Sequence, residues 1–281
     1  MNTANLKLRK QDQVAWIQID RPTKLNAINK EVLGELHQVF FDLQQDNSIR
    51  VIVLTGSGEK AFVAGADIAE FSEFTPSQGK ELSQSGQDNV FTFIEQMNKP
   101  VIAAINGPAV GVGVTMTLPM DIRLASKDAK FGFVFARRGL VPEAASSWFL
   151  PRLVGISKAL EWTYSGRVFS SEEALEGGLV RSIHEPDELL TEAKNIAKEI
   201  IENTSSISVS LTRQMLWKML GADHPMEAHK VDSRFIYELG RGNDAKEGVN
   251  SFLEKRPPEF PNKVSKDMPD YYPWWDEKEF S

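Results

Sequence analysis

The segment from Pro100 to Thr115 limits the possible folds of this chain more than any other stretch. Its apolar run, Val101–Ile105, is bounded by a proline and an Asn-Gly pair, which is typical of a strand buried on both faces. Gly111 and Gly113 then precede an apolar segment, Val114–Met120, for which we expect a helix. Glycines allow the backbone to approach a ligand closely, and the first amides of a helix have no partner within it. The segment therefore predicts a site where backbone N–H groups and the helix dipole stabilise negative charge.

Other short apolar runs predict a sheet with helical connections. Leu6–Arg9 and Val14–Ile19 are predicted to be strands around a polar turn. Asn29 is a suitable N-cap for a helix with apolar residues at helical spacing, and Val51–Leu54 follows as a buried strand. The order of strand, helix and strand predicts parallel pairing with right-handed crossovers. The expected fold class is therefore α/β, with further strands at Asp121–Ala125, Phe131–Phe133 and Leu179–Ile183.

The last third of the chain differs in pattern. Ser170 and Glu173 form a capping-box pattern that predicts the start of a helix. Helical spacing of apolar residues then dominates from 186 nearly to 256. The final segment, 257–281, is rich in proline, charge and aromatic rings. Large rings are seldom left in water, so we expect this tail to dock on the body of the protein or on a neighbouring subunit.

Composition excludes several classes of protein. The chain has 281 residues, 41% of them hydrophobic, which is enough for a sizeable core. Its 32 basic and 39 acidic residues give a net charge of -7, which argues against a general nucleic-acid binder. The absence of cysteine excludes disulfides, thiolate nucleophiles and cysteine-based metal sites. No apolar run is long enough to span a bilayer, and the first residues do not resemble a signal peptide. We therefore expect a cytoplasmic protein with no membrane partner.

Several familiar motifs are incomplete in this sequence. After Gly111 and Gly113, Met116 stands where the dinucleotide fingerprint requires a third glycine. The Gly-x-Ser-x-Gly elbow of α/β-hydrolases does not occur. Of the four histidines, only His224 and His229 have a spacing compatible with metal ligands, and we expect surface or core roles for all four. Dinucleotide, hydrolase-elbow and histidine-metal chemistry are therefore not predicted.

Four stretches, taken in their order, resemble the crotonase superfamily, the enoyl-CoA hydratase/isomerase family. They are Arg21–Ala27, Ala61–Glu70 with its Ala-Gly-Ala-Asp-Ile core, Pro100–Gly113, and the ending Phe252–Arg256. The resemblance covers nearly the whole chain apart from the aromatic tail. It implies acyl-CoA thioester chemistry, a crotonase-like spiral of repeated ββα units with a C-terminal helical region, and a homotrimer or dimer of trimers. We accordingly expect a core at 1–200, a helical trimerisation region at 201–256 and a tail at 257–281.

The resemblance also implies where the substrate binds. Members of the family hold the thioester oxygen with two backbone amides, which correspond here to Ala66 and Val112. Charge moves onto that oxygen as the thioester gains enolate character, so two fixed donors stabilise the transition state more than the ground state. The family's CoA contacts correspond to Lys24, Leu25, Ala27, Ala64, Asp67, Ile68, Ala69, Phe252 and Lys255. Coenzyme A is then part of the substrate, and we expect no separate cofactor and no metal.

The sequence departs from the family's hydratases at two positions. Those hydratases use two glutamates to position and activate water, and the glutamates would stand at Thr115 and Phe135 here. Threonine is no base near neutral pH, and phenylalanine is no base at all. Hydration by the usual two-carboxylate route is therefore in conflict with the sequence.

Glu143 offers a different acid–base group. The segment Pro142–Ser147 resembles the single-glutamate Δ3,Δ2-enoyl-CoA isomerases, in which a glutamate at this position is the base. One carboxylate suffices for a 1,3-proton shift, so the leading prediction is such an isomerase in fatty-acid metabolism. A helix N-terminus lowers the pKa of this carboxyl, and an apolar wall of Phe135, Val112 and Trp148 would have to raise it again. The alternatives are hydration or another crotonase reaction such as thioester hydrolysis, and a non-catalytic acyl-CoA-binding protein.

Overall fold

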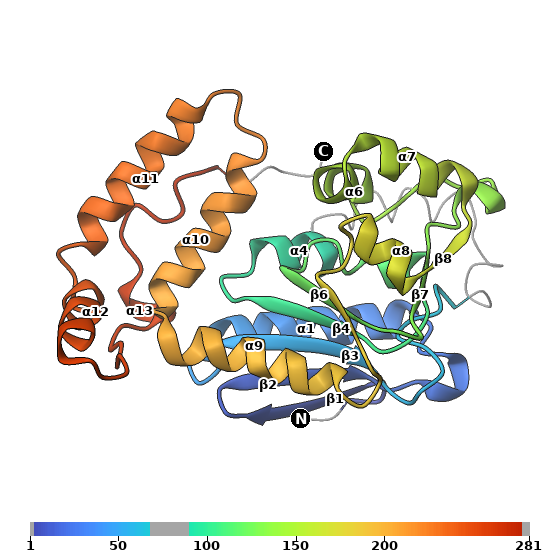
Figure 1. The fold of residues 1–281 in the computed structure, drawn as a ribbon, viewed down its shortest axis with the longest axis horizontal. Coiled ribbons are helices and arrows are strands. Elements are labelled where there is room, and N and C mark those ends of the chain that lie inside the picture. Colours follow the sequence, from blue (N-terminus) through green and yellow to red (C-terminus); the bar gives the residue numbers. More distant parts are fainter. Residues whose placement is uncertain (1–2, 68–89, 277–281) are drawn as a thin grey trace.

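A six-stranded sheet forms the centre of the chain, in a computed structural model that describes residues 3–67 and 90–276 (Figure 1). The strands lie side by side in the order β1 (Leu6–Gln11), β2 (Val14–Ile19), β3 (Val51–Gly56), β4 (Val101–Ile105), β6 (Ile122–Ser126) and β9 (Ser182–His184). β1 and β2 are antiparallel, and every other neighbouring pair is parallel. Helix α1 (Lys30–Gln45), capped by Asn29, connects β2 to β3, so the predicted parallel pair is confirmed.

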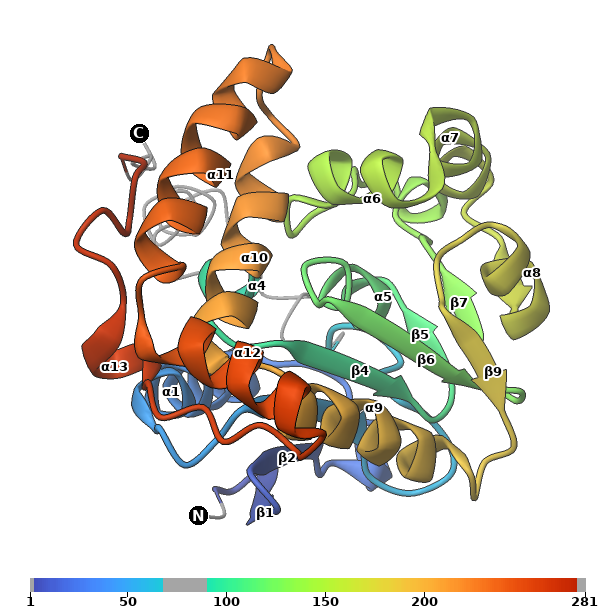
Figure 2. The ribbon, with the colours of Figure 1, turned by 60° about the vertical axis from the view of Figure 1, so that its left-hand side comes forward.

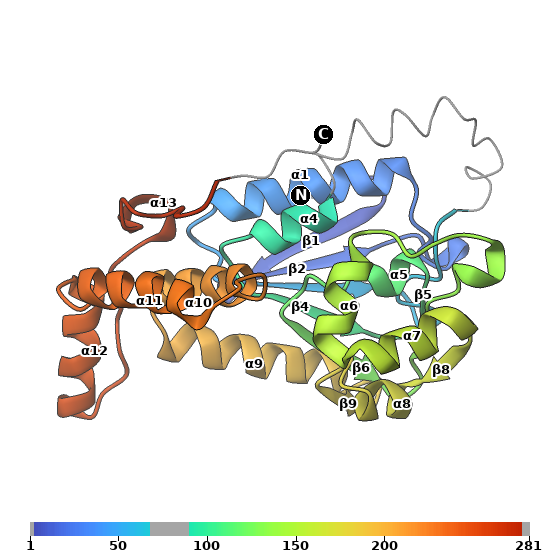
Figure 3. The same cartoon turned by 90° about the horizontal axis from the view of Figure 1, so that it is seen from above.

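Strand β4 is buried on both faces, as its uniformly apolar sequence predicts. Val101, Ala103 and Ile105 pack in a cluster with α1 and α4 (Val90–Gln96). The intervening residues, Ile102 and Ala104, pack in a second cluster with α9 (Leu189–Asn203). Figure 3 shows the resulting layers, with α1 and α4 on one face of the sheet and α9 on the other.

A smaller sheet and a group of short helices follow β4. The sheet contains β5 (Ala109–Val110), β7 (Lys130–Gly132) and β8 (Val168–Ser170). The helices are α5 (Val112–Thr115), the 3-10 helix η3 (Ala136–Arg138), α6 (Ser146–Val154), α7 (Ile156–Ser165) and α8 (Ser171–Glu176). Ser170 caps α8 by accepting a hydrogen bond from the amide of Glu173, as the capping-box pattern predicts.

The predicted helix over Val114–Met120 is wrong in its extent, because α5 ends at Thr115. Pro119 lies within the predicted helix and has no N–H to donate to the preceding turn, which disfavours a continuous α-helix. Arg123 is buried beside the same segment. Its Nη1 donates to the carbonyl oxygens of Thr117 at 3.2 Å and Met120 at 2.6 Å. The amides of Thr117 and Leu118 donate to the carbonyl oxygens three residues earlier, Val114 O and Thr115 O, so the chain continues as tight turns rather than as an α-helix.

Four helices occupy the C-terminal part and stand beside the sheet rather than on it (Figures 1 and 2). They are α10 (Ser206–Met219), α11 (Pro225–Leu239), α12 (Asn243–Glu254) and α13 (Val264–Asp267). The described part of the tail docks on them through its rings: Tyr271 and Trp274 pack on Phe235 of α11, at centroid distances of 5.4 and 5.3 Å. The tail therefore covers its own chain, which confirms one of the two expected modes of docking. The division at residues 200 and 256 stays a prediction.

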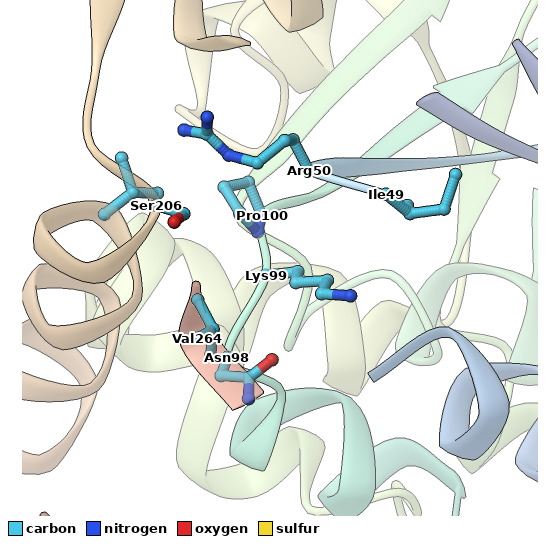
Figure 4. Close-up of a pocket in the computed structure, with 8 residues that line it drawn as sticks. Ile49, Arg50, Asn98, Lys99, Pro100, Ser206 and Val264 are labelled. Atoms are coloured by element: carbon cyan, nitrogen blue, oxygen red, sulfur yellow. The ribbon is translucent and has the colours of Figure 1, made fainter. Parts of the chain in front are cut away.

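Lys99 is a buried cation beside the start of β4. Its residue is 4% exposed, and its Nζ donates to the carbonyl oxygens of Leu43 and Asp46, at the end of α1. Figure 4 shows Lys99 with Arg50 and Asn98 around a small cavity. Burial lowers the pKa of the Lys99 ammonium to about 8, and the attraction of Asp46 offsets only part of this effect.

This lysine predicts an unusual dependence of stability on pH. An unfolded lysine binds its proton up to about pH 10.5, whereas folded Lys99 loses it near pH 8, so the unfolded state holds more protons in between. We expect its contribution to the free energy of unfolding to rise across that window, by an amount on the order of 1–3 kcal/mol. Urea unfolding at a series of pH values measures this rise. The Lys99→Met variant should lack it, and an identical rise in the variant would contradict the prediction.

Candidate active site

Two turns meet at the carboxyl end of the central strands, one around Val63–Asp67 and one around Pro108–Gly113. Val63 pairs with Ala109 as a parallel bridge, and Val110 N donates to Val63 O at 3.1 Å. Neither the amide of Ala66 nor that of Val112 donates to an acceptor within the described ranges 3–67 and 90–276. Two unused backbone donors thus come from turns that contact each other.

Glycine is required where these turns approach most closely. A Cβ at Gly113 would lie 2.1 Å from the carbonyl oxygen of Val63, far inside van der Waals contact. Gly65 and Gly111 have φ angles of +129° and +57°, a region that side chains disfavour. The proximity of the turns supports the prediction that the amides of Ala66 and Val112 act together. That both amides bind one thioester oxygen stays a prediction.

Glu143 reaches α5 from a loop that lies 28 residues further along the chain. The hydroxyl of Thr115, which is fully buried, donates to Oε1 of Glu143. The residue as a whole is exposed to solvent, whereas its carboxyl group, which bonds to the buried Thr115, is partly desolvated by the surrounding protein. This desolvation raises the pKa of the Glu143 carboxyl above its usual range, and the hydrogen bond from Thr115 acts in the opposite direction. The predicted base is therefore bonded to Thr115, which lies three residues after the predicted donor Val112 on α5.

The backbone next to Glu143 has an uncommon conformation. Ala144 and Ala145 follow with φ angles of 56° and 52°, both in the left-handed region. Such a conformation costs a non-glycine residue roughly 1–2 kcal/mol. Ser146 N then donates to Glu143 O at 3.0 Å, and α6 begins. Two consecutive left-handed alanines fold the chain back so that Glu143 stands just before the helix.

The three side chains predicted to form an apolar wall lie in one hydrophobic cluster, but their contact with Glu143 stays a prediction. Phe135, Val112 and Trp148 belong to the same apolar cluster as Ala144, which is 8% exposed. Trp217 of α10 joins this cluster too. Sequence analysis missed Trp217, because no local motif marks it and only the packing of α10 places it there.

The predicted CoA loops are held together by backbone and side-chain bonds. Ala64 N donates to Leu25 O at 3.1 Å, so the loop that carries Lys24, Leu25 and Ala27 lies against the loop of Ala64. Arg21 connects the two, because its guanidinium donates to Ala27 O and pairs with Asp67 at 3.2 Å. Lys24 and Leu25 remain exposed.

Two residues therefore shape these loops in a way that the sequence did not indicate. Arg21 binds the carboxylate of Asp67, so this side chain, predicted to contact CoA, has a structural partner. Asn26 is buried, and its Nδ2 donates to the carbonyl oxygens of Ser57 and Ala61, both at 2.9 Å. The side chains of Arg21 and Asn26 thus hold the predicted CoA loops in place.

Other predicted site residues lie apart or outside the described ranges. Phe252 lies on α12 and Lys255 directly follows it, and this helix is far from α5 and α6 within one chain (Figure 3). Phe252 is 82% exposed. Ile68 and Ala69 lie outside the described residues.

The described residues also contain no cluster suited to a metal ion. His224 instead caps α11 by accepting a hydrogen bond from Met226 N at 3.1 Å. No helix within the described ranges has the length and apolar character needed to cross a membrane.

The bond between Thr115 and Glu143 can be tested through pH. Because that bond lowers the pKa of Glu143, the Thr115→Val variant should have a base with a higher pKa. The base works only when deprotonated, so the acidic limb of the kcat/KM profile should move to higher pH. Thr117→Val is the matched control, since Thr117 bonds to Val114 O and not to Glu143. An unmoved limb in Thr115→Val, or an equal shift in both variants, would contradict the assignment.

Comparisons with known proteins agree with this arrangement. The sequence profile of the enoyl-CoA hydratase/isomerase family matches residues 9–263. Enoyl-CoA hydratase AKT3-2 of Alternaria alternata is 39% identical over 89% of this chain and 83% of that protein. The short-chain-enoyl-CoA hydratase of Clostridium acetobutylicum is 36% identical over 91% of this chain and 97% of its own length. A crystal structure of an enoyl-CoA hydratase from Bacillus anthracis matches with a TM-score of 0.86 at 31% identity, over 91% of this chain and 98% of that one.

Proposed function

The chain belongs to the enoyl-CoA hydratase/isomerase family and is an acyl-CoA enzyme of the crotonase type, and from this premise we propose that it is an enoyl-CoA isomerase. The observation that carries the proposal is the hydrogen bond between Thr115 and Glu143. It puts one carboxylate, with a raised pKa, beside the helix that begins at Val112. Positions 115 and 135, where hydratases of the family would carry their glutamates, hold threonine and phenylalanine.

The proposed reaction needs one base and one oxyanion site. The thioester oxygen of a 3-enoyl-CoA accepts hydrogen bonds from the amides of Ala66 and Val112. Glu143 takes a proton from C2, and the electron pair of that C–H bond moves through the thioester onto its oxygen. The resulting dienolate takes the proton back at C4, so the double bond moves to C2–C3 and Glu143 is again a carboxylate. Electrostatic stabilisation by the two amides is strongest in the dienolate, which is why it lowers the barrier.

Hydration is the second candidate, and a specific observation favours it. The relatives with 36–39% identity are named enoyl-CoA hydratases. In that reaction Glu143 alone would take a proton from water as the oxygen adds to C3 of a 2-enoyl-CoA, and would deliver a proton to C2. The same amides would hold the enolate in between. The two reactions thus share a site and differ in substrate and in the need for water.

Product analysis separates the two candidates. The purified protein is given a 3-enoyl-CoA and a 2-enoyl-CoA in parallel, and the products are resolved by chromatography. An isomerase should convert the 3-enoyl-CoA at least about tenfold faster than it forms a 3-hydroxyacyl-CoA, the difference expected from about 1.4 kcal/mol in barrier. A faster hydration would replace the proposal with the second candidate. Tight binding of CoA without turnover of either substrate would leave a non-catalytic acyl-CoA-binding protein.

We also propose that the protein acts as an oligomer, a homotrimer or dimer of trimers. Phe252 and Lys255 correspond to CoA contacts of the family but lie away from Glu143 within one chain. They can serve a CoA molecule only at the site of another copy. Large apolar side chains on α11 and α12 support this assembly, since Ile236 of α11 and Leu253 of α12 are 74% and 71% exposed. The cytoplasmic location and a role in fatty-acid metabolism stay predictions.

A further inference from the structure

Trp217, a residue of helix α10, packs across onto the first turn of α6. Its ring lies 5.4 Å from that of Phe149, edge to face at 85°, and 6.2 Å from that of Trp148. Trp148 and Phe149 are themselves in edge-to-face contact at 4.9 Å. Figure 2 shows α10 standing beside α6. Three rings from two helices thus form one contact, although the helices are far apart in the sequence.

Hydrogen bonds and an ion pair hold the main chain of α10 in place next to Trp217. Arg213, one turn earlier, is 6% exposed, and its guanidinium pairs with Asp121 at 2.9 Å. It also donates to the carbonyl oxygens of Ile94 at 2.7 Å and Met97 at 2.6 Å, which end α4. Asp121 accepts a further bond from Nε1 of Trp217 at 3.2 Å. A buried cation bound to this many acceptors holds the helix rigidly against the sheet.

Trp217 differs from its neighbours on the same helix. Ile207 and Leu211 pack in a separate cluster with α11, and Met215 and Met219 lie against that cluster. Trp217 instead packs on the main core cluster that includes Phe135, Ala144 and Phe149. It is therefore the side chain through which α10 reaches the surroundings of Glu143.

A short and tightly bonded path connects this ring contact to Glu143. Phe149 N and Trp148 N both donate to Ala145 O, at 3.1 and 2.9 Å. Ala145 and its predecessor are the two left-handed alanines that follow Glu143. Strained backbone of this kind persists only where its surroundings hold it. The aromatic contact with α10 is such a constraint, because it fixes the turn from which the strained pair emerges.

We propose that Trp217 is a positioning residue for Glu143, acting through Phe149, Trp148 and the first turn of α6. The inference rests on the proposed function, in which Glu143 is the base. Displacement of a catalytic group by about 1 Å through a remote change can cost roughly a hundredfold in rate. Loss of Trp217 should therefore slow the chemical step while the CoA loops, on other elements, keep their affinity.

The test compares three substitutions on the substrate that the wild-type protein turns over, a 3-enoyl-CoA or a 2-enoyl-CoA. Trp217→Leu should lower kcat by about tenfold to a hundredfold, with KM changed less than about twofold. Trp217→Phe keeps a ring against Phe149 and should restore most of kcat. Trp16→Leu is the matched control, because Trp16 lies on β2 in the cluster with α9, and it should leave kcat nearly unchanged. Rates are expressed per CoA-binding site counted by titration, because a role of Trp217 in folding alone would lower the number of sites and leave kcat per site unchanged.

Several results would overturn the proposal. Wild-type kcat in Trp217→Leu would do so, as would a loss confined to KM. If that variant does not fold, Phe149→Leu breaks the same contact from α6 and must give the same loss in kcat. Glu143→Gln is assayed in parallel to separate the two hypotheses. Full activity of the glutamine variant would remove the role of Glu143 and this inference with it, whereas an inactive glutamine variant beside an unaffected Trp217→Leu would remove this inference alone.

Discussion

The Glu143→Gln variant is expected to lose about 10²–10⁴-fold in kcat, the usual contribution of a general acid–base group. Glutamine has nearly the shape of glutamate, and its amide oxygen can still accept the hydrogen bond from Thr115. It cannot take a proton from C2 or from water, so only the chemical step is removed. The measurement is steady-state turnover of the enoyl-CoA that the wild-type protein prefers, together with direct binding of CoA.

The binding measurement distinguishes lost chemistry from lost structure. The affinity for CoA should stay near the wild-type value, since the loops around Lys24 and Ala64 are built from other elements. Glu176→Gln, at an exposed position that ends α8, is the matched control and should leave both kcat and affinity unchanged. If Glu143→Gln keeps the wild-type kcat, another group carries the proton, and both the isomerase and the hydratase schemes with Glu143 are wrong.

The central strands of the larger sheet could be predicted because their apolar runs indicate burial, whereas the short strands β5 and β8 were not predicted. Val101–Ile105 is apolar at every position, and in the structure its side chains enter two different clusters in alternation. The glycines that follow were also informative, since Gly113 is in contact with Val63 where a side chain does not fit. Patterns of this kind are local, and a local pattern predicts the structure correctly when it agrees with the packing around it.

The contacts that complete the site are not local and could not be predicted in the same way. The resemblance placed Glu143 and Thr115 in the site separately, but their hydrogen bond joins residues 28 positions apart. The pair of Arg21 with Asp67 spans 46 positions. Each of these depends on where two segments meet, which periodicity does not describe.

Gly113→Ala is expected to have the second large effect, on both stability and turnover. The new Cβ would lie 2.1 Å from Val63 O and 2.9 Å from Val63 C, and backbone atoms cannot rotate away as a side chain does. The turn of Val63 and the start of α5 would have to separate, which strains the bond of Val110 N to Val63 O. Overpacking of this kind costs roughly 1–3 kcal/mol of stability. The amide of Val112 would move with the helix, and loss of one oxyanion donor typically lowers kcat by about 10²–10³-fold.

Alanine substitutions at two other glycines separate the effect of steric overlap from the effect of backbone strain. Gly34, exposed in α1 with no atom within 4 Å of a new Cβ, should tolerate alanine and gain up to about 1 kcal/mol in stability. Gly111 has open space but a φ of +57° with a ψ of -122°, a backbone conformation that residues with a side chain rarely adopt, so its alanine variant should lose roughly 1–3 kcal/mol through backbone strain alone. Urea unfolding and kcat/KM of the three variants measure the order directly. If Gly113→Ala matched Gly34→Ala in both quantities, the two turns would not be in contact, and the amides of Ala66 and Val112 would have no reason to act on the same oxygen.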